Sequence, residues 1–227
     1  MDRHDLSAGN VAKIGAGALA AVMVYSLAAE AVESAREFAQ LSIAPVFFGV
    51  GVPRGDGHPV MALPGWLAND TYLQPLLGWL ERIGYTPVAS GIKRNSGRLA
   101  PLIRDAGDRV AASVRESGRP ATLVGHSLGG VIARGIARQR PEIVRQVITI
   151  ASPLNFDAAP IGAPIPLTAI YSRADRIVRY PRALAPAGAR TDGGRNIEVA
   201  GCHCGMAFNS QVYWILAQLL PENPLPQ

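Results

Sequence analysis

The chain of 227 residues is long enough for one domain with a substantial core and is short for two. Hydrophobic residues make up 48% of it and charged residues only 17%, which excludes an intrinsically disordered chain. The formal net charge of +5 comes from basic residues scattered along the chain, without a basic run or an interleaved aromatic set. We therefore expect no nucleic-acid binding.

The N-terminal segment predicts a helix whose setting the sequence leaves open. Residues 14–29 form an apolar run, with Lys13 before it and Glu30 after it. This run is short and rich in glycine and alanine for a membrane-spanning helix, and the residues before it carry mixed charge, unlike a typical signal peptide. Helix-forming residues continue past Glu30, so we expect a helical extension over 1–44, with its helix at about 11–40.

Three settings stay open for this helix: docking on the body or a partner, membrane association as an anchor or interfacial helix, and a cleaved signal. The localisation, cytoplasmic or membrane-associated, therefore also stays open, and so does the oligomeric state.

Residues 45–227 are expected to form one α/β domain. Short apolar runs typical of buried strands alternate with stretches of helical periodicity, two of which end at a glycine. Such alternation predicts a mainly parallel sheet covered by helices on both faces. In chain order we expect strands at 60–63, 86–90, 121–124, 147–151, 167–172 and 196–199, and helices at 71–83, 98–117, 128–139 and 209–220.

The sequence Gly125-His126-Ser127-Leu128-Gly129 lies where the strand at 121–124 should turn into the next helix. A serine at such a corner takes a strained backbone conformation, and glycines on either side avoid collisions with the neighbouring strand and helix. The hydroxyl then stands above the sheet, next to backbone N–H groups at a helix N-terminus. The pattern predicts Ser127 as a nucleophile, against the alternative of a glycine-rich turn with an incidental serine. We interpret His126 as filling the turn.

A serine nucleophile needs a base, and the base needs an acid that fixes its tautomer. After a nucleophile at a strand-to-helix turn, the acid comes next in the chain and the histidine last. Of the four histidines only His203 follows Ser127, so we expect it to be the base. Asp175 follows the strand at 167–172 by three residues and is the first candidate for the acid. Asp157, in the loop after the preceding strand, is the reserve.

Cys202 and Cys204 flank the candidate base and raise the question of a metal. Three adjacent residues cannot easily turn toward one ion, and no second cluster supplies the other ligands, so we expect neither a metal nor a cofactor. A disulfide across this spacing would be strained, and we expect free thiols.

Acyl transfer needs two N–H groups aimed at the developing oxyanion. The N–H of Leu128, which follows the nucleophile, is one. The second is expected from the loop Leu63-Pro64-Gly65-Trp66-Leu67 after the first strand, where Trp66 is the first candidate. The Trp66 indole could line an acyl pocket or simply pack against the protein, and the sequence leaves both roles open.

The segments GHSLGG, IYSRADRIV and GCHCGM together resemble the α/β-hydrolase superfamily. The C-terminal part is similar to small bacterial triacylglycerol lipases and related esterases, and PVMALPGWLAND resembles members with a PGF-type oxyanion loop. The more familiar oxyanion loop of this superfamily has His-Gly, and in this sequence Pro64 replaces that histidine. The resemblance covers about 45–220 and implies an α/β-hydrolase fold in which Ser127, Asp175 and His203 form the triad and Trp66 and Leu128 are the oxyanion donors.

Only about 15 residues separate the strands at 147–151 and 167–172, where this superfamily commonly inserts a cap, so we expect a minimal cap or none. The sequence as a whole predicts a serine carboxylic-ester hydrolase, an esterase or lipase that acts on a small acyl ester or lipid through an acyl-enzyme. Two alternatives stay open: a thioesterase or acyltransferase with the same triad, and a membrane-associated binding or scaffolding protein that keeps the fold.

Overall fold

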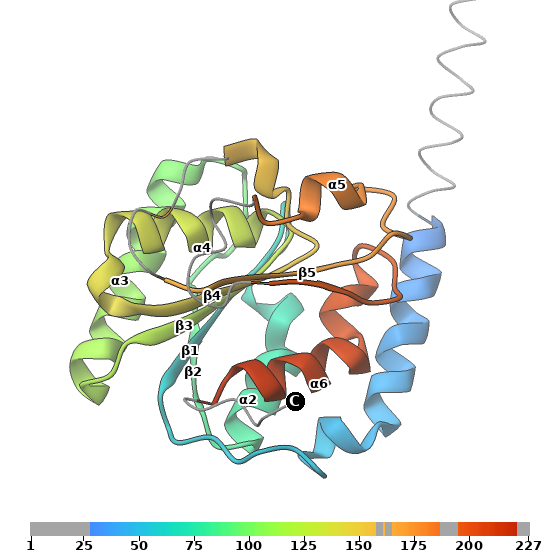
Figure 1. Ribbon diagram of the computed structural model, residues 1–227, viewed down its shortest axis with the longest axis horizontal. Helices are drawn as coiled ribbons and strands as arrows, with labels where there is room; N and C mark the ends of the chain where they lie inside the picture. The colour runs from blue at the N-terminus through green and yellow to red at the C-terminus, as the bar shows by residue number, and fades with distance from the viewer. Residues whose placement is uncertain (1–27, 158–160, 162–164, 187–194, 222–227) are drawn as a thin grey trace, which may run out of the picture.

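The computed structural model describes residues 28–157, 161, 165–186 and 195–221. Over these residues the chain forms one six-stranded sheet in the order β2-β1-β3-β4-β5-β6, and every neighbouring pair of strands is parallel (Figure 1). The expected parallel α/β architecture is thereby confirmed. The strands are β1 (Pro59–Leu63), β2 (Thr86–Ala89), β3 (Ala121–His126), β4 (Val144–Ile150), β5 (Leu167–Tyr171) and β6 (Asn196–Glu198).

Helices cover both faces of the sheet because the central strands are apolar on both sides. Every residue of β1, β3 and β5 is buried, as expected for a parallel sheet between two helical layers. In Figure 1 one layer contains α3 and α4, and the other contains α2 and α6, each packed on its own apolar cluster. The helices are α2 (Gln74–Arg82), α3 (Leu99–Ser117), α4 (Leu128–Gln139), α5 (Tyr180–Ala183) and α6 (Ser210–Leu219).

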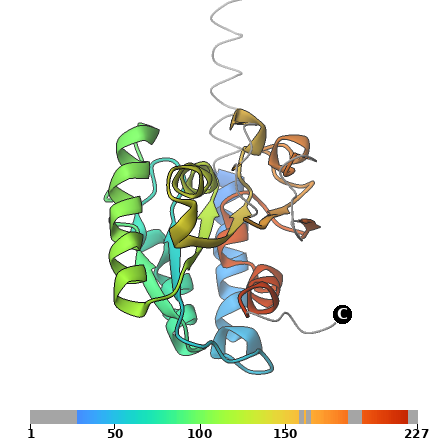
Figure 2. The same ribbon diagram turned by 60° about the vertical axis from the view of Figure 1, so that its left-hand side comes forward.

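The chain enters this body through a helix at residues 28–43, here called the N-terminal helix. It lies beside α6 and the loop that precedes α6, as Figures 1 and 2 show from two directions. Leu41 is fully buried in the cluster that α2 and α6 share, and the Phe38 ring meets Phe208 edge to face at 5.6 Å. The described part of the helix is therefore packed on the body. The expected helical residues 11–27 lie outside the described ranges.

Among the described residues, no helix combines the length and the hydropathy that crossing a membrane requires.

Two expected elements differ from the structure for local reasons. The helix expected at 71–83 is a 3-10 turn, η2 (Asp70–Leu73), followed by α2, because Pro75 lacks an N–H and favours the first turn of a helix. Strand β4 begins at Val144 rather than 147. Its early residue Gln146 is polar, and its amide donates to Thr122 Oγ1 and to the Leu219 carbonyl, which compensates for its burial.

Short elements around the sheet were not expected from the sequence, since none is long enough for a periodic pattern. They are α5 and the 3-10 helices η1 (Pro45–Phe48), η3 (Pro141–Ile143), η4 (Leu154–Asp157) and η6 (Gly205–Phe208). The other expected strands and helices lie within three residues of their observed bounds.

Candidate active site

Ser127 stands at the corner between β3 and α4 with φ 54° and ψ −124°, a conformation that few non-glycine residues adopt. Its N–H donates to the Ile150 carbonyl at 2.8 Å, which ties the corner to β4. A Cβ on Gly125 would lie 2.4 Å from Gly130 Cα, and a Cβ on Gly129 would lie 2.1 Å from the Leu63 carbonyl oxygen. Both glycines are therefore required by the close approach of helix and strands.

His203 and Asp175 meet Ser127 at the carboxyl edge of the sheet. Asp175 lies in the loop after β5, and His203 lies in the loop after β6. Because the strands are parallel, these loops emerge at the same edge as the corner after β3, although Ser127 and His203 are 76 residues apart in the chain. The sheet therefore assembles three side chains that the sequence keeps apart.

These three side chains form a hydrogen-bonded chain. His203 Nε2 lies 3.0 Å from Ser127 Oγ, and His203 Nδ1 lies 2.8 Å from Asp175 Oδ2. An ionised carboxylate only accepts, so Nδ1 carries the proton and Nε2 is left to accept from the serine hydroxyl. His203 and Asp175 are each 4% exposed, while Ser127 is partly exposed. Ser127 is thus partly open to solvent, whereas the two residues that would activate it are shielded.

The backbone fixes the Asp175 carboxylate in place. Its Oδ1 accepts from the N–H groups of Ile177 and Val178, both at 2.8 Å, while Oδ2 faces the imidazole. Three hydrogen bonds to the two carboxylate oxygens hold the side chain in one orientation. Asp157, the reserve acid, belongs to η4, and the carboxylate that contacts His203 comes from Asp175.

The loop after β1 lies against the serine. A Cβ on Gly65 would come within 3.0 Å of Ser127 Cβ, so this position also needs a glycine. The loop is held by Asn95, a fully buried residue whose side-chain amide donates to the Pro64 carbonyl at 2.9 Å. The Asn95 backbone also exchanges two hydrogen bonds with the loop, one with Leu67 and one with Ala68, both at 2.8 Å. Nothing in the sequence around Asn95 indicated this role.

Within the described chain, the N–H groups of Trp66 and Leu128 donate to no other group. Leu128 follows Ser127 at the N-terminus of α4, where the helix dipole is positive, and Trp66 follows Gly65, the residue of the loop after β1 that approaches Ser127. The Trp66 side chain is 64% exposed, which argues against simple core packing. A Cβ on Gly97 would lie 3.8 Å from this indole and 3.9 Å from the Leu128 side chain, so the loop at 91–98 lies next to both candidate oxyanion residues.

His126 has a contact that the sequence interpretation missed. Its Nε2–H donates to the His203 carbonyl at 2.9 Å, and the two rings lie 5.2 Å apart. Burial is the main cause that lowers the pKa of His126 to about 4, and the neighbouring His203 imidazole acts in the same direction. It is therefore neutral near pH 7, and it ties the loop of the candidate base to the corner of the candidate nucleophile.

Comparisons with known proteins find similar sequences and folds. Residues 108–206, which include Ser127, Asp175 and His203, match the family model described as the PGAP1-like alpha/beta domain. Over 106 residues, or 46% of the chain, the sequence is 33% identical to the pimeloyl-[acyl-carrier protein] methyl ester esterase of Shewanella woodyi. The match spans 40% of that relative's length.

Solved structures share the fold at low sequence identity. The monoacylglycerol lipase of Paleococcus ferrophilus superposes with a TM-score of 0.55 at 15% identity, over 73% of this chain and 96% of that one. A thioesterase from the prodiginine pathway of Streptomyces coelicolor gives a TM-score of 0.55 at 16% identity, over 80% and 94% of the two chains.

Proposed function

We propose that this chain, a member of the α/β-hydrolase superfamily, is a serine hydrolase that cleaves carboxylic esters of small acyl or lipid substrates. One observation carries the proposal: the uninterrupted chain of hydrogen bonds from Ser127 through His203 to Asp175, with 3.0 and 2.8 Å between the bonded atoms. The strained backbone at Ser127 supports it, because such strain is concentrated at functional positions.

In the proposed reaction, Ser127 Oγ attacks the ester carbonyl carbon while its proton passes to His203 Nε2. The carbonyl oxygen becomes an oxyanion, which the free N–H groups of Leu128 and Trp66 would stabilise. As the tetrahedral intermediate collapses, the carbon–oxygen bond to the alcohol breaks, and the alcohol leaves with the proton from His203. The acyl group is now esterified to Ser127.

Hydrolysis of the acyl-enzyme repeats these steps with water as the nucleophile. His203 accepts a proton from water as the water oxygen attacks the acyl carbonyl, and then returns it to Ser127 Oγ as the acid product leaves. Asp175 stays ionised, holds the Nδ1–H tautomer and stabilises the imidazolium that forms twice in each cycle. Its two backbone hydrogen bonds keep it oriented throughout.

Exposed apolar side chains on two loops that carry the candidate site support an acyl substrate. Trp66, Leu67 and Ile177 are each about half exposed or more, although large apolar side chains usually avoid water. Trp66 and Leu67 belong to the proposed oxyanion loop, and Ile177 follows Asp175 by two residues. The esterase of Shewanella woodyi is named for a methyl ester substrate, and its 33% identity to this chain supports an ester in preference to other acyl compounds.

A panel of p-nitrophenyl esters with acyl chains of two to sixteen carbons, with matching thioesters, tests this proposal. We expect the wild type to hydrolyse esters faster than thioesters, and Ser127→Ala to lose about 10⁴-fold or more in kcat. Ser117→Ala, an exposed serine at the end of α3, is the matched control and should keep wild-type activity. A preference for thioesters would point to a thioesterase instead, and an inactive wild type would refute the proposal.

A further inference from the structure

The backbone around His203 is held by side chains from three separate elements: the N-terminal helix, η2 and β3. Both backbone polar groups of Cys204, the next residue, are hydrogen-bonded: Glu30 Oε2 accepts from its N–H at 3.1 Å, and the Tyr72 hydroxyl donates to its carbonyl at 2.7 Å. His126 holds the carbonyl of His203 itself. Glu30 belongs to the N-terminal helix, so a segment far away in the sequence contacts the residue next to the candidate base.

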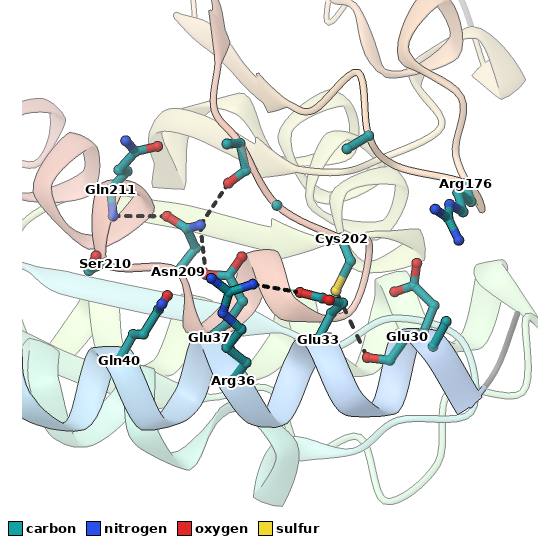
Figure 3. Close-up of a pocket in the computed structure, with 14 residues that line it drawn as sticks. Glu30, Glu33, Arg36, Glu37, Gln40, Arg176, Cys202, Asn209, Ser210 and Gln211 are labelled. Carbon is teal, nitrogen blue, oxygen red and sulfur yellow. Dashed lines mark hydrogen bonds and ion pairs between the residues drawn. The ribbon is translucent and has the colours of Figure 1, made fainter.

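A second carboxylate of the same helix holds the other part of this loop. Glu37 Oε2 accepts from Asn209 Nδ2 at 2.8 Å, and the same amide donates to the Ala200 carbonyl at 2.8 Å (Figure 3). A Cβ on Gly205 would lie 2.9 Å from Glu37 Cγ, so the loop needs a glycine to lie this close to the helix. Asn209 also caps α6 with its Oδ1, which fixes its orientation.

Apolar packing does not explain these contacts. A cavity of about 630 Å³ lies between the N-terminal helix and the loop, and Glu30, Glu37 and Cys202 are among its lining residues (Figure 3). The helix is already attached to the body by Leu41 and Phe38. Glu30 as a residue is only 6% exposed. Burial of a charged side chain costs free energy unless hydrogen bonds compensate, so an apolar residue at this position would attach the helix to the body at lower cost.

We infer that Glu30 and Glu37 of the N-terminal helix are positioning residues for the proposed reaction: they fix the loop at 200–205 so that His203 lies within reach of both Ser127 and Asp175. The inference rests on the proposed function. On this inference the helix at 28–43 both packs on the body and positions the loop that carries His203. The two carboxylates touch neither substrate nor reacting atoms and act only through the loop backbone.

Variants of the full-length chain separate positioning from simple structural support. Glu30→Ala removes the acceptor for the Cys204 N–H, whereas Glu30→Gln keeps an oxygen at nearly the same place. Glu33→Ala is the matched control, because Glu33 lies on the same helix, is exposed and, among the residues that the structure describes, forms an ion pair only with Arg36 of its own helix, at 3.7 Å. For each variant we would measure kcat and KM on p-nitrophenyl butyrate, the rate of fluorophosphonate labelling and the thermal unfolding midpoint.

We expect Glu30→Ala to lower kcat and the labelling rate by about 10- to 100-fold with KM within twofold, at a temperature where the variant is folded, because a displacement of about 1 Å has such effects. Glu30→Gln should recover most of the loss, and Glu33→Ala should match the wild type. A folded Glu30→Ala with wild-type kcat would overturn the inference, as would a Glu30→Gln that is as slow as Glu30→Ala.

If Glu30→Ala does not fold, the Glu37→Ala variant provides the test. We expect it to lose kcat by the same factor, and a folded Glu37→Ala with wild-type kcat would refute the inference. Failure of the proposed function looks different, since the wild type itself would then neither hydrolyse esters nor react with the probe. An active wild type with unaffected glutamate variants would refute only the role of the helix.

Discussion

Gly129→Ala adds one methyl group where α4, β1 and the loop after β1 meet. Its Cβ would lie 2.1 Å from the Leu63 carbonyl oxygen and 2.9 Å from the Pro64 carbonyl oxygen. Since Cβ atoms do not approach other atoms closer than 3.0 Å, helix and strand must separate by about 0.9 Å. Overpacking of this kind costs about 1–3 kcal/mol, which corresponds to a fall of about 2–12 °C in the thermal unfolding midpoint.

The same displacement moves Ser127 relative to the oxyanion donors, so we expect kcat on p-nitrophenyl esters to fall by about 100-fold. Calorimetry and steady-state kinetics measure the two effects. Gly78→Ala is the matched control, because Gly78 is an exposed residue within α2 whose added Cβ meets nothing within 4 Å. That variant should be as stable as the wild type or up to about 1 kcal/mol more stable. A Gly129→Ala protein with wild-type midpoint and kcat would refute the argument.

Three further predictions concern two buried polar residues, Asn95 and His126, and the half-buried thiol of Cys204. Asn95→Ala leaves the Pro64 carbonyl without its donor. We expect the free energy of unfolding, measured in urea, to fall by about 1–3 kcal/mol, and kcat to fall as well. If neither quantity changes, Asn95 does not have this role. Because burial lowers the pKa of His126 to about 4, below its unfolded value near 6.5, the folded state resists protonation and loses stability as pH falls from about 6.5 to 4. Urea midpoints should fall over this range less steeply in His126→Gln, and equal slopes would exclude His126 as the cause. Burial raises the pKa of Cys204 to about 11, so mass spectrometry should show slow alkylation by iodoacetamide at pH 7 in the folded protein and rapid alkylation in urea; rapid reaction when folded would contradict the burial.

The parallel sheet and the three central side chains could be predicted because each leaves a local or countable signal. Buried strands appear as apolar runs, and the glycines around Ser127 indicate a crowded corner. His203 is the one histidine downstream of that serine, and Asp175 follows a strand. The parallel topology then brings these strand ends together, as the structure shows.

The supporting residues could not be predicted, because their contacts are long-range and involve single polar side chains. Asn95 reaches the loop after β1, and Tyr72 and Glu30 reach Cys204, from segments whose patterns predict only a loop or a helix. The contact of His126 was unpredictable for the same reason: its partner is a backbone carbonyl 77 residues away. The sequence also left the setting of the N-terminal helix open, whereas the structure shows residues 28–43 packed on the body.

Labelling by a fluorophosphonate probe tests the central claim most directly, because the probe forms a covalent bond only with a serine that a neighbouring base activates. We predict that the wild type is labelled on the peptide that contains Ser127, that Ser127→Ala is not labelled, and that His203→Ala is labelled at least 10³-fold more slowly. Labelling of a different serine, or a folded wild-type protein that does not react, would contradict the assignment of Ser127 as the nucleophile.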